Sequence, residues 1–396
     1  MTTVYKDSTK RNVALLAACQ ALLFTNNSTL IAINGLAGLA LAPYIGLATL
    51  PVTCWVLGGA IGTMPASLHM KRVGRQRGLT MGTLWGIVGA LICAWAIWMQ
   101  SFWLLCFGTL VFGVYNAYGQ YYRFAAADAA SGDFKPVAIS LVLAGGLVGG
   151  ILGPTSSRWT IGLLSPKFMA AYLVLIGFAV ATMLLLRLIR IPTPSAAEQR
   201  APGRPLREIA AQPKFIVAVL AGAIGYGVMN FLMTSTPIAM QVCGHPYSDA
   251  AFVISSHIIG MFAPSFVTGP LIKRIGVLPV MFAGVLCNLG AIAIALSGIA
   301  VAQFWFSLVL LGVGWNFLYL GGTTLLTETY RPEERARAQG TNEQAIFIMM
   351  AISSFTSGMT VTTAGWARVN LLALPLIAVV GIALVWYATT RRRAAA

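Results

Sequence analysis

The chain has 396 residues, of which 58% are hydrophobic and only 9% are charged, and its mean hydropathy is +0.80. This composition excludes an ordinary water-soluble domain and is typical of a membrane protein that crosses the bilayer many times. The formal net charge of +16 does not indicate a nucleic-acid partner, because the basic residues follow a membrane topology. We expect a protein that is not an enzyme and whose surroundings are a lipid bilayer.

Twelve apolar stretches along the chain are each long enough to cross a hydrocarbon core of ~30 Å as a helix. They cover residues 12–34, 44–67, 79–99, 102–124, 137–158, 168–187, 215–240, 249–271, 278–298, 302–327, 343–363 and 370–390. The sequence therefore predicts an all-α membrane protein with twelve transmembrane helices.

The basic residues predict how these spans are oriented. If the N-terminus lies inside, only Arg158, Lys167 and Arg368 of the 26 Lys and Arg residues fall in outer segments. This asymmetry is the positive-inside pattern. We expect a multi-pass protein of a bacterial inner membrane with both termini in the cytoplasm.

The two halves of the chain repeat each other. The tetrapeptide at 71–74 (Lys-Arg-Val-Gly) returns as Lys-Arg-Ile-Gly at 273–276, and 273 − 71 = 202. A Phe-Trp pair at 102–103 returns at 304–305 with the same offset. Parallel repeats of this kind predict two pseudo-symmetric six-helix bundles, at residues 1–190 and 214–396, joined by a cytoplasmic linker at 191–213.

Duplicated halves and basic loops ending in glycine resemble the major facilitator superfamily over essentially the whole chain. The resemblance implies a transporter that alternates access to a site near the middle of the membrane.

Polar side chains inside the spans give two open interpretations. They either line a central aqueous cavity or form hydrogen bonds between helices. The residues concerned are Gln20, Thr25, Asn26, Asn27, Asn116, Gln120 and Asn316. At the inner ends of spans four and ten, we interpret Arg123 with Asp128 and Glu328 with Arg331 as cytoplasmic gate or loop pairs. For Asp128 a solvated loop charge is the favoured alternative.

Soft metal-ligating side chains occur in spans seven and eight. Met229 and Met233 stand four residues apart on one helix face, as do His257 and Met261 on the next helix. The two helices run antiparallel, and a rise of ~1.5 Å per residue places all four at similar depth. Thioethers and imidazole suit Cu(I), so these side chains predict one metal site.

The pairing of Met-x-x-x-Met with His-x-x-x-Met resembles the CcoA-like copper importers, and Met229, Met233, His257 and Met261 match that pattern. The resemblance implies inward transport of copper, as Cu(I), for cytochrome oxidase assembly. Copper would be the substrate, and we expect no organic cofactor and a monomer. Cys54 in span two and Cys243 at the outer end of span seven are further candidate ligands, although each residue type is more often a small buried hydrophobe.

Other functions fit the same residues. The first alternative is an organic-solute carrier of the flavin or drug type, in which polar groups of spans one and four hold the substrate and the methionines form an apolar wall. The second is a membrane factor that holds copper without transporting it. None of the ten acidic residues lies in the middle of a span, which argues against exchange of cationic drugs for protons. His257 is then the main candidate for any proton linkage.

Overall fold

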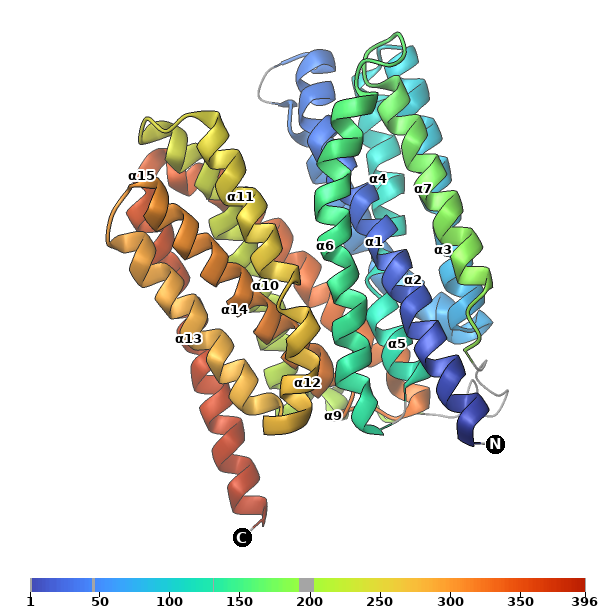
Figure 1. Ribbon diagram of the computed structural model, residues 1–396, viewed down its shortest axis with the longest axis vertical. Coiled ribbons are helices and arrows are strands. Elements are labelled where there is room, and N and C mark those ends of the chain that lie inside the picture. Colours follow the sequence, from blue (N-terminus) through green and yellow to red (C-terminus); the bar gives the residue numbers. More distant parts are fainter. Residues whose placement is uncertain (1, 45–46, 131, 192–202, 396) are drawn as a thin grey trace. The chain divides into compact units, whose positions relative to one another are not determined.

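The computed structural model describes residues 2–44, 47–130, 132–191 and 203–395, and all its regular elements in these ranges are helices (Figure 1). The chain divides into two compact units. The first comprises Met1–Ser131 with Leu141–Ala201, and the second comprises Gly132–Ser140 with Pro202–Ala396. The proposed domain boundaries at 190 and 214 remain a prediction, and most of the proposed linker, 192–202, lies outside the described residues.

Helices in the first half are α1 (Thr2–Leu41), α2 (Leu50–Val73), α3 (Arg75–Trp98), α4 (Phe102–Gly119), α5 (Tyr122–Ala129), α6 (Lys135–Thr160) and α7 (Met169–Arg187). Those in the second half are α9 (Leu206–Ala210), α10 (Pro213–Val242), α11 (Tyr247–Phe262), α12 (Ser265–Ile275), α13 (Val277–Leu296), α14 (Val301–Leu326) and α15 (Arg335–Ala395). Short 3₁₀ turns lie at Gly132–Phe134 and Pro332–Glu334.

Each predicted span falls on a helix, although three spans differ in form from a single straight helix. Span eight is divided into α11 and α12 because Pro264 between them cannot donate a backbone hydrogen bond. The last two spans both lie in α15, which is interrupted at Gly365, where the backbone has a non-helical φ of 77°. Ten described stretches are long and apolar enough to cross a membrane, and the 60-residue stretch Pro332–Arg391 is long enough for two crossings.

The repeat predicted from the sequence reappears in the backbone. Gly74 separates α2 from α3 with φ 89° and ψ 159°, and Gly276 separates α12 from α13 with φ 89° and ψ 164°. Each glycine donates its backbone N–H to the carbonyl four residues earlier, on Met70 and Ile272 respectively. Residues other than glycine rarely adopt a φ of this kind. This is why the basic motif ends in a glycine in each half of the chain.

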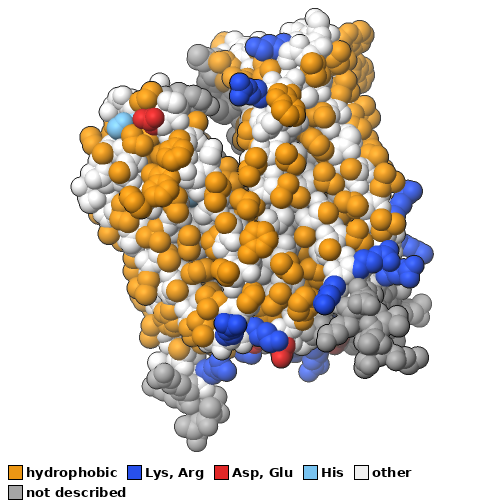
Figure 2. Space-filling model, in the orientation of Figure 1, with side chains coloured by type: hydrophobic (Ala, Val, Ile, Leu, Met, Phe, Trp, Pro, Cys, Tyr) orange, Lys and Arg blue, Asp and Glu red, His pale blue; other side chains and the backbone are white. Residues whose placement is uncertain are grey.

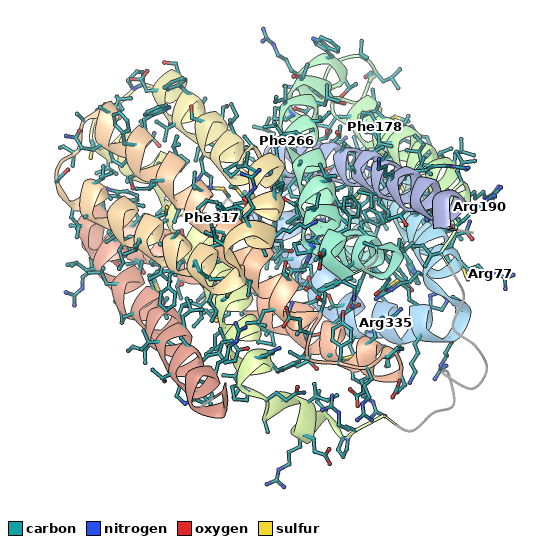
Figure 3. All side chains as sticks on the ribbon, turned by 60° about the horizontal axis from the view of Figure 1, so that its bottom comes forward. Arg77, Phe178, Arg190, Phe266, Phe317 and Arg335 are labelled. Carbon is teal, nitrogen blue, oxygen red and sulfur yellow. The ribbon has the colours of Figure 1, made fainter. Side chains whose placement is uncertain are left out.

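Small residues allow the helices within each unit to approach closely. A Cβ atom on Gly284 of α13 would lie 3.0 Å from the Cβ of Phe317 on α14, and Phe317 lies between these helices in Figure 3. The outer flanks of the helices carry hydrophobic side chains, while Lys and Arg gather toward helix ends (Figure 2). This surface is the one that a lipid-embedded bundle requires.

Candidate functional site

The half-exposed face of α10 combines aromatic, amide, thioether and hydroxyl side chains. Asn230 follows Tyr226 by four residues, and Met233 and Thr234 follow Asn230 by three and four, so the four side chains share one face of the helix. All four are half-buried, whereas Val228, Met229 and Leu232 are buried. An amide and a hydroxyl on a lipid-facing stripe would be costly, so this face is suited to a polar ligand. Asn230 is held by its Nδ2, which donates to Ser353 Oγ at 2.9 Å on α15.

Aromatic rings pack behind this face of α10. Tyr226 meets Trp315 edge-on, with ring centroids 5.5 Å apart, and meets Tyr319 in the same manner at 5.6 Å. Trp315 and Tyr319 stack at 4.8 Å, and Phe262 of α11 packs edge-on against Trp315. We call Tyr226, Phe262, Trp315 and Tyr319 the aromatic cluster. Its buried members fix the orientation of the Tyr226 ring, the one that is half-exposed.

One polar atom of the aromatic cluster is left without a partner. Trp315 is only 1% exposed, and its indole Nε1 has no hydrogen-bond acceptor among the described residues. Buried polar groups are nearly always paired, so such a donor calls for an explanation. A bound substrate with a carbonyl or hydroxyl oxygen is one group that would satisfy it.

The first unit contains a cluster of amides of its own. Asn27 of α1 donates through Nδ2 to Asn116 Oδ1 of α4 at 2.8 Å, and Gln120 donates to the same oxygen at 3.2 Å. Asn27 and Asn116 are buried, while Gln120 is half-exposed. Asn27 and Asn116 therefore form a hydrogen bond between helices, which is one of the two interpretations given above. Gln120 is exposed enough to contact a ligand, as the cavity interpretation requires.

Asn316 in span ten serves packing within the second unit. Its Nδ2 donates to Met261 O at 2.7 Å and to Ser265 Oγ at 2.6 Å, and its Oδ1 accepts from Thr268 at 2.8 Å. These bonds span the break at Pro264 between α11 and α12. Asn316 is fully buried, so it joins α14 to both pieces of span eight.

His257 is directed toward α14. It is fully buried, and its Nδ1 lies 2.6 Å from the carbonyl oxygen of Leu308, so that nitrogen carries the proton and donates. Its Nε2 has no partner among the described residues. A Cβ on Gly312 would lie 2.8 Å from both the carbonyl oxygen of His257 and the backbone nitrogen of Met261, so α11 packs tightly against α14 at this depth.

The six predicted metal ligands are distributed over both units. Met229, His257 and Met261 are buried, Met233 and Cys243 are half-buried, and all five belong to the second unit, whereas Cys54 belongs to the first. Among the described residues, no group of three or more His, Cys, Asp or Glu side chains lies close enough to hold a metal ion. The convergence of the Met and His side chains on one point remains a prediction.

One of the two ion pairs expected from the sequence is replaced by another. Glu328 pairs with Lys214 at 2.8 Å, so the expected pair with Arg331 was wrong. Asp128 accepts from Arg75 Nε at 3.0 Å, and both side chains are nearly buried. The buried Arg123 guanidinium donates to Gln120 and lies over the ring of Phe124 at 4.6 Å. Arg75 and Lys214 lie on helices far along the chain from their carboxylates, and Gln120 lies one turn before Arg123. The order of charged residues near a loop does not reveal such partners.

Sequence reasoning missed the aromatic cluster. Asn316 is among the polar residues noted inside the spans, whereas no role was predicted for Trp315 beside it or for Tyr226, three residues before Met229. The spacing of Trp315 and Tyr319, four residues apart on one helix, is the signal that points to stacked rings.

One family model matches most of the chain. The model of the Major Facilitator Superfamily matches residues 16–320 and 237–396. The fold is also that of FucP in its outward conformation, with a TM-score of 0.77 over 96% of this chain and 99% of that one, at 16% identity. At this identity the likeness concerns the fold alone.

Two relatives cover nearly the same length. Riboflavin transporter RfnT of Brucella anthropi is 39% identical over 381 residues, which are 95% of each chain. Uncharacterized MFS-type transporter YddS of Bacillus subtilis is 29% identical over 364 residues, 86% of this chain and 82% of its own.

Proposed function

Because the chain belongs to the Major Facilitator Superfamily, we propose that it transports a flavin of the riboflavin type across the membrane. The observation that carries this proposal is the 39% identity with a riboflavin transporter along 95% of both chains. The proposal corresponds to the organic-solute alternative of the sequence analysis rather than to its copper interpretation.

The chemistry of the α10 face supports a flavin substrate. Riboflavin presents a large planar ring system, an edge rich in carbonyl and N–H groups, and a chain of hydroxyls. Tyr226 offers an aromatic face held from behind by the aromatic cluster, and flat rings stack on such faces. Asn230 and Thr234 lie one and two turns along the same stripe and offer hydrogen-bonding groups for the polar edge or the hydroxyls.

Charge also favours a neutral substrate of this kind. A cationic substrate would require a carboxylate at membrane depth, and the ten acidic residues lie near the ends of the spans instead. Riboflavin carries no net charge at neutral pH, so its transport needs no such group.

Uptake of radiolabelled riboflavin by a riboflavin-auxotrophic bacterial strain tests the proposal. Cells producing the protein should accumulate riboflavin, and an excess of a flavin that lacks the hydroxylated side chain should compete through the ring alone. Ribitol should not compete. Absence of riboflavin accumulation despite normal abundance in the membrane would overturn the proposal.

A second candidate function is copper uptake, and one observation favours it. The buried Nε2 of His257 has no partner among the described residues, and a copper ion is a group that would occupy it. Buried Met229 and Met261 would add thioether ligands. This proposal includes import as Cu(I) for oxidase assembly, with no organic cofactor.

Copper accumulation in the same cells separates the two functions. If copper is the substrate, a Met229→Ala, Met233→Ala double variant should lose copper uptake while keeping normal membrane abundance. Copper uptake equal to that of the wild type would remove the methionines from the account.

A further inference from the structure

Exposed arginines from three helices gather at the predicted cytoplasmic end of the first unit, where α7 ends. Gln76 of α3 donates through Nε2 to the carbonyl oxygens of Leu186 and Arg187, at 3.3 and 2.9 Å. Arg11 of α1 donates to the carbonyl oxygen of Leu188 at 3.1 Å. The last carbonyl groups of a helix lack partners within that helix, so these bonds fasten the end of α7 to both α1 and α3.

The residues that follow α7 are held against α1 as well. Asn12 of α1 donates through Nδ2 to the carbonyl oxygen of Arg190 at 2.8 Å, and its Oδ1 accepts from the Arg190 backbone N–H at 3.1 Å. Asn12 is buried, whereas the Arg190 side chain is exposed. The backbone of Arg190 is therefore fixed while its guanidinium stays outside. Arg190 and Arg77 lie at the same edge of the first unit in Figure 3.

These contacts create an excess of positive charge at one place. We call Arg11, Arg77, Arg187 and Arg190 the arginine cluster, and all four are exposed. In the part of the chain that the structure describes, none of the four forms an ion pair with a carboxylate. The C-terminus of α7 offers only roughly half an elementary negative charge. Four neighbouring cations repel one another, so an anion from the surroundings would stabilise the cluster.

Apolar side chains continue from the arginine cluster toward the membrane interior. On α3, Met81 follows Arg77 by four residues and is 48% exposed. On α7, Leu184 precedes Arg187 by three residues and is 56% exposed. Residues at these spacings share one helix face. Each of the two helices thus presents a cation and, one turn deeper in the membrane, a surface for acyl chains. Phosphate and acyl chains of a phospholipid are stacked in the same order.

We propose that the arginine cluster binds the phosphate groups of an anionic phospholipid, with the two phosphates of cardiolipin as the matching headgroup. Guanidinium groups form paired, charge-assisted hydrogen bonds with phosphate oxygens. Basic pockets between transmembrane helices on the cytoplasmic side are a known setting for such headgroups. Two phosphates neutralise more of a fourfold positive charge than one does. Phosphatidylethanolamine has no net charge and is a poor competitor.

The lipid site is separate from the α10 face, because all four arginines belong to the first unit and α10 belongs to the second. The inference therefore does not depend on which substrate is transported.

Native mass spectrometry of the delipidated full-length protein in detergent, with cardiolipin added in steps, tests the site. The variant Arg77→Gln, Arg187→Gln, Arg190→Gln removes three charges but keeps Arg11, whose side chain holds the end of α7. It should raise the cardiolipin concentration for half-occupancy of the tightest site at least about tenfold, because each basic residue adds to the attraction for anionic lipid.

A matched control removes three exposed charges from the second unit. The variant Arg207→Gln, Lys273→Gln, Arg274→Gln should bind cardiolipin as the wild type does. Equal melting temperatures without lipid check that both variants are folded. Phosphatidylethanolamine, inorganic phosphate and glycerol phosphate should each fail to displace cardiolipin from the wild type.

Three results would overturn the inference. The first is an unchanged cardiolipin affinity in the variant of the arginine cluster. The second is an equal loss of affinity in the control, which would mean that total charge acts rather than a site. The third is complete displacement of cardiolipin by inorganic phosphate or glycerol phosphate, which would make the cluster a site for free phosphate.

Discussion

Tyr226 is the aromatic side chain through which the second unit can meet a flat substrate. Its ring is half-exposed, while Trp315 and Tyr319 behind it are 1% and 3% exposed. The buried rings cannot stack on a ligand without rearrangement, but they restrict the Tyr226 ring to one orientation. Binding by a pre-oriented ring loses less conformational entropy than binding by a mobile one.

Tyr226→Ala should therefore weaken riboflavin transport much more than Tyr226→Phe. Stacking of a planar ring on an aromatic side chain contributes roughly 1–3 kcal/mol, so the KM of uptake should rise about ten- to hundredfold in the alanine variant. The phenylalanine variant keeps the ring and should remain close to the wild type. Equal uptake by all three proteins would separate Tyr226 from substrate binding.

The hydrogen bond of His257 determines which of its ring nitrogens could bind a metal. Its Nδ1 donates to Leu308 on α14, which leaves Nε2 as the nitrogen available for a metal. A carbonyl partner of this kind fixes the tautomer of a ligating histidine.

His257→Ala should abolish copper uptake if the imidazole is a ligand, and it should leave riboflavin uptake measurable if the flavin alone is transported. Parallel uptake assays of both substrates in one strain give the answer. His257→Gln, which keeps a donor for Leu308 O, controls for the lost hydrogen bond. Copper uptake by His257→Ala at the wild-type level would contradict a ligand role.

At the element scale, some helices of this protein pack closely because a glycine at their crossing lets the two backbones approach each other. At the crossing of α11 and α14, a Cβ on Gly312 would lie 2.8 Å from the carbonyl carbon of Gly260 and from the carbonyl oxygen of His257. Backbone atoms cannot turn aside as a flexible side chain can. A side chain at this crossing must push the helices apart.

Gly312→Ala should lower the stability of the folded protein by about 1–3 kcal/mol, the usual cost of overpacking. Gly358→Ala on α15 is the matched control, because nothing lies within 4 Å of its added Cβ. Alanine in an unobstructed helix position is favourable by up to about 1 kcal/mol. Thermal unfolding in detergent measures both, and a Gly312→Ala variant as stable as the control would contradict this packing.

The described part of the proposed linker is bound to the 3₁₀ turn that precedes α15. Arg204 donates from Nε and an Nη atom to the two oxygens of Glu334 at 2.8 and 2.7 Å, and its backbone N–H donates to the same carboxylate. The Glu334 side chain is fully buried, while both partners of the Lys214–Glu328 pair are exposed. Removing one partner of a buried pair leaves an uncompensated charge, and exposed pairs contribute little.

Arg204→Ala should consequently lower the melting temperature, and Lys214→Ala should hardly change it. Limited proteolysis offers a second measurement, because the chain near 204 should be cut faster once the pair is lost. Similar melting temperatures for both variants would mean that the Arg204–Glu334 pair adds no stability.

At the scale of the whole molecule, two similar helical units are consistent with duplication of a six-helix segment. Matching glycine conformations at 74 and 276 support this interpretation beyond the shared letters of the motif. Both loops carry Lys and Arg in the last turn of the preceding helix, where positive side chains complement the helix dipole. The same residues contribute to the positive-inside pattern from which we predict the orientation of the protein in the membrane.

Membrane orientation can be checked with single cysteines in a variant that lacks the six native ones. Gly162→Cys, between α6 and α7, should react with a membrane-impermeant maleimide in intact cells. Gly132→Cys, between α5 and α6, should react only after the cells are opened. Neither position has another atom within 4 Å of an added Cβ. The reverse labelling pattern would invert the topology, and riboflavin uptake by each variant confirms that it is folded.

The sequence by itself determined the membrane class, the positions of the spans, the duplication and the all-α major facilitator fold. These follow from run length, charge placement and repeated motifs, which are properties of neighbouring residues along the chain. Periodicity along one helix also revealed which side chains share a face, as for Met229 with Met233 and His257 with Met261. It could not reveal which helix each face meets.

Only the tertiary structure decided those partners. In the folded protein His257 lies against Leu308. Asp128 pairs with Arg75, and Glu328 pairs with Lys214. The rings of the aromatic cluster come from three helices. The physical reason is that contacts between helices depend on register and crossing, which small residues such as Gly58 and Gly312 set through backbone approach. The register between helices brings together residues that are 51 to 114 positions apart in the sequence. Periodicity along a single helix carries no information about such pairs.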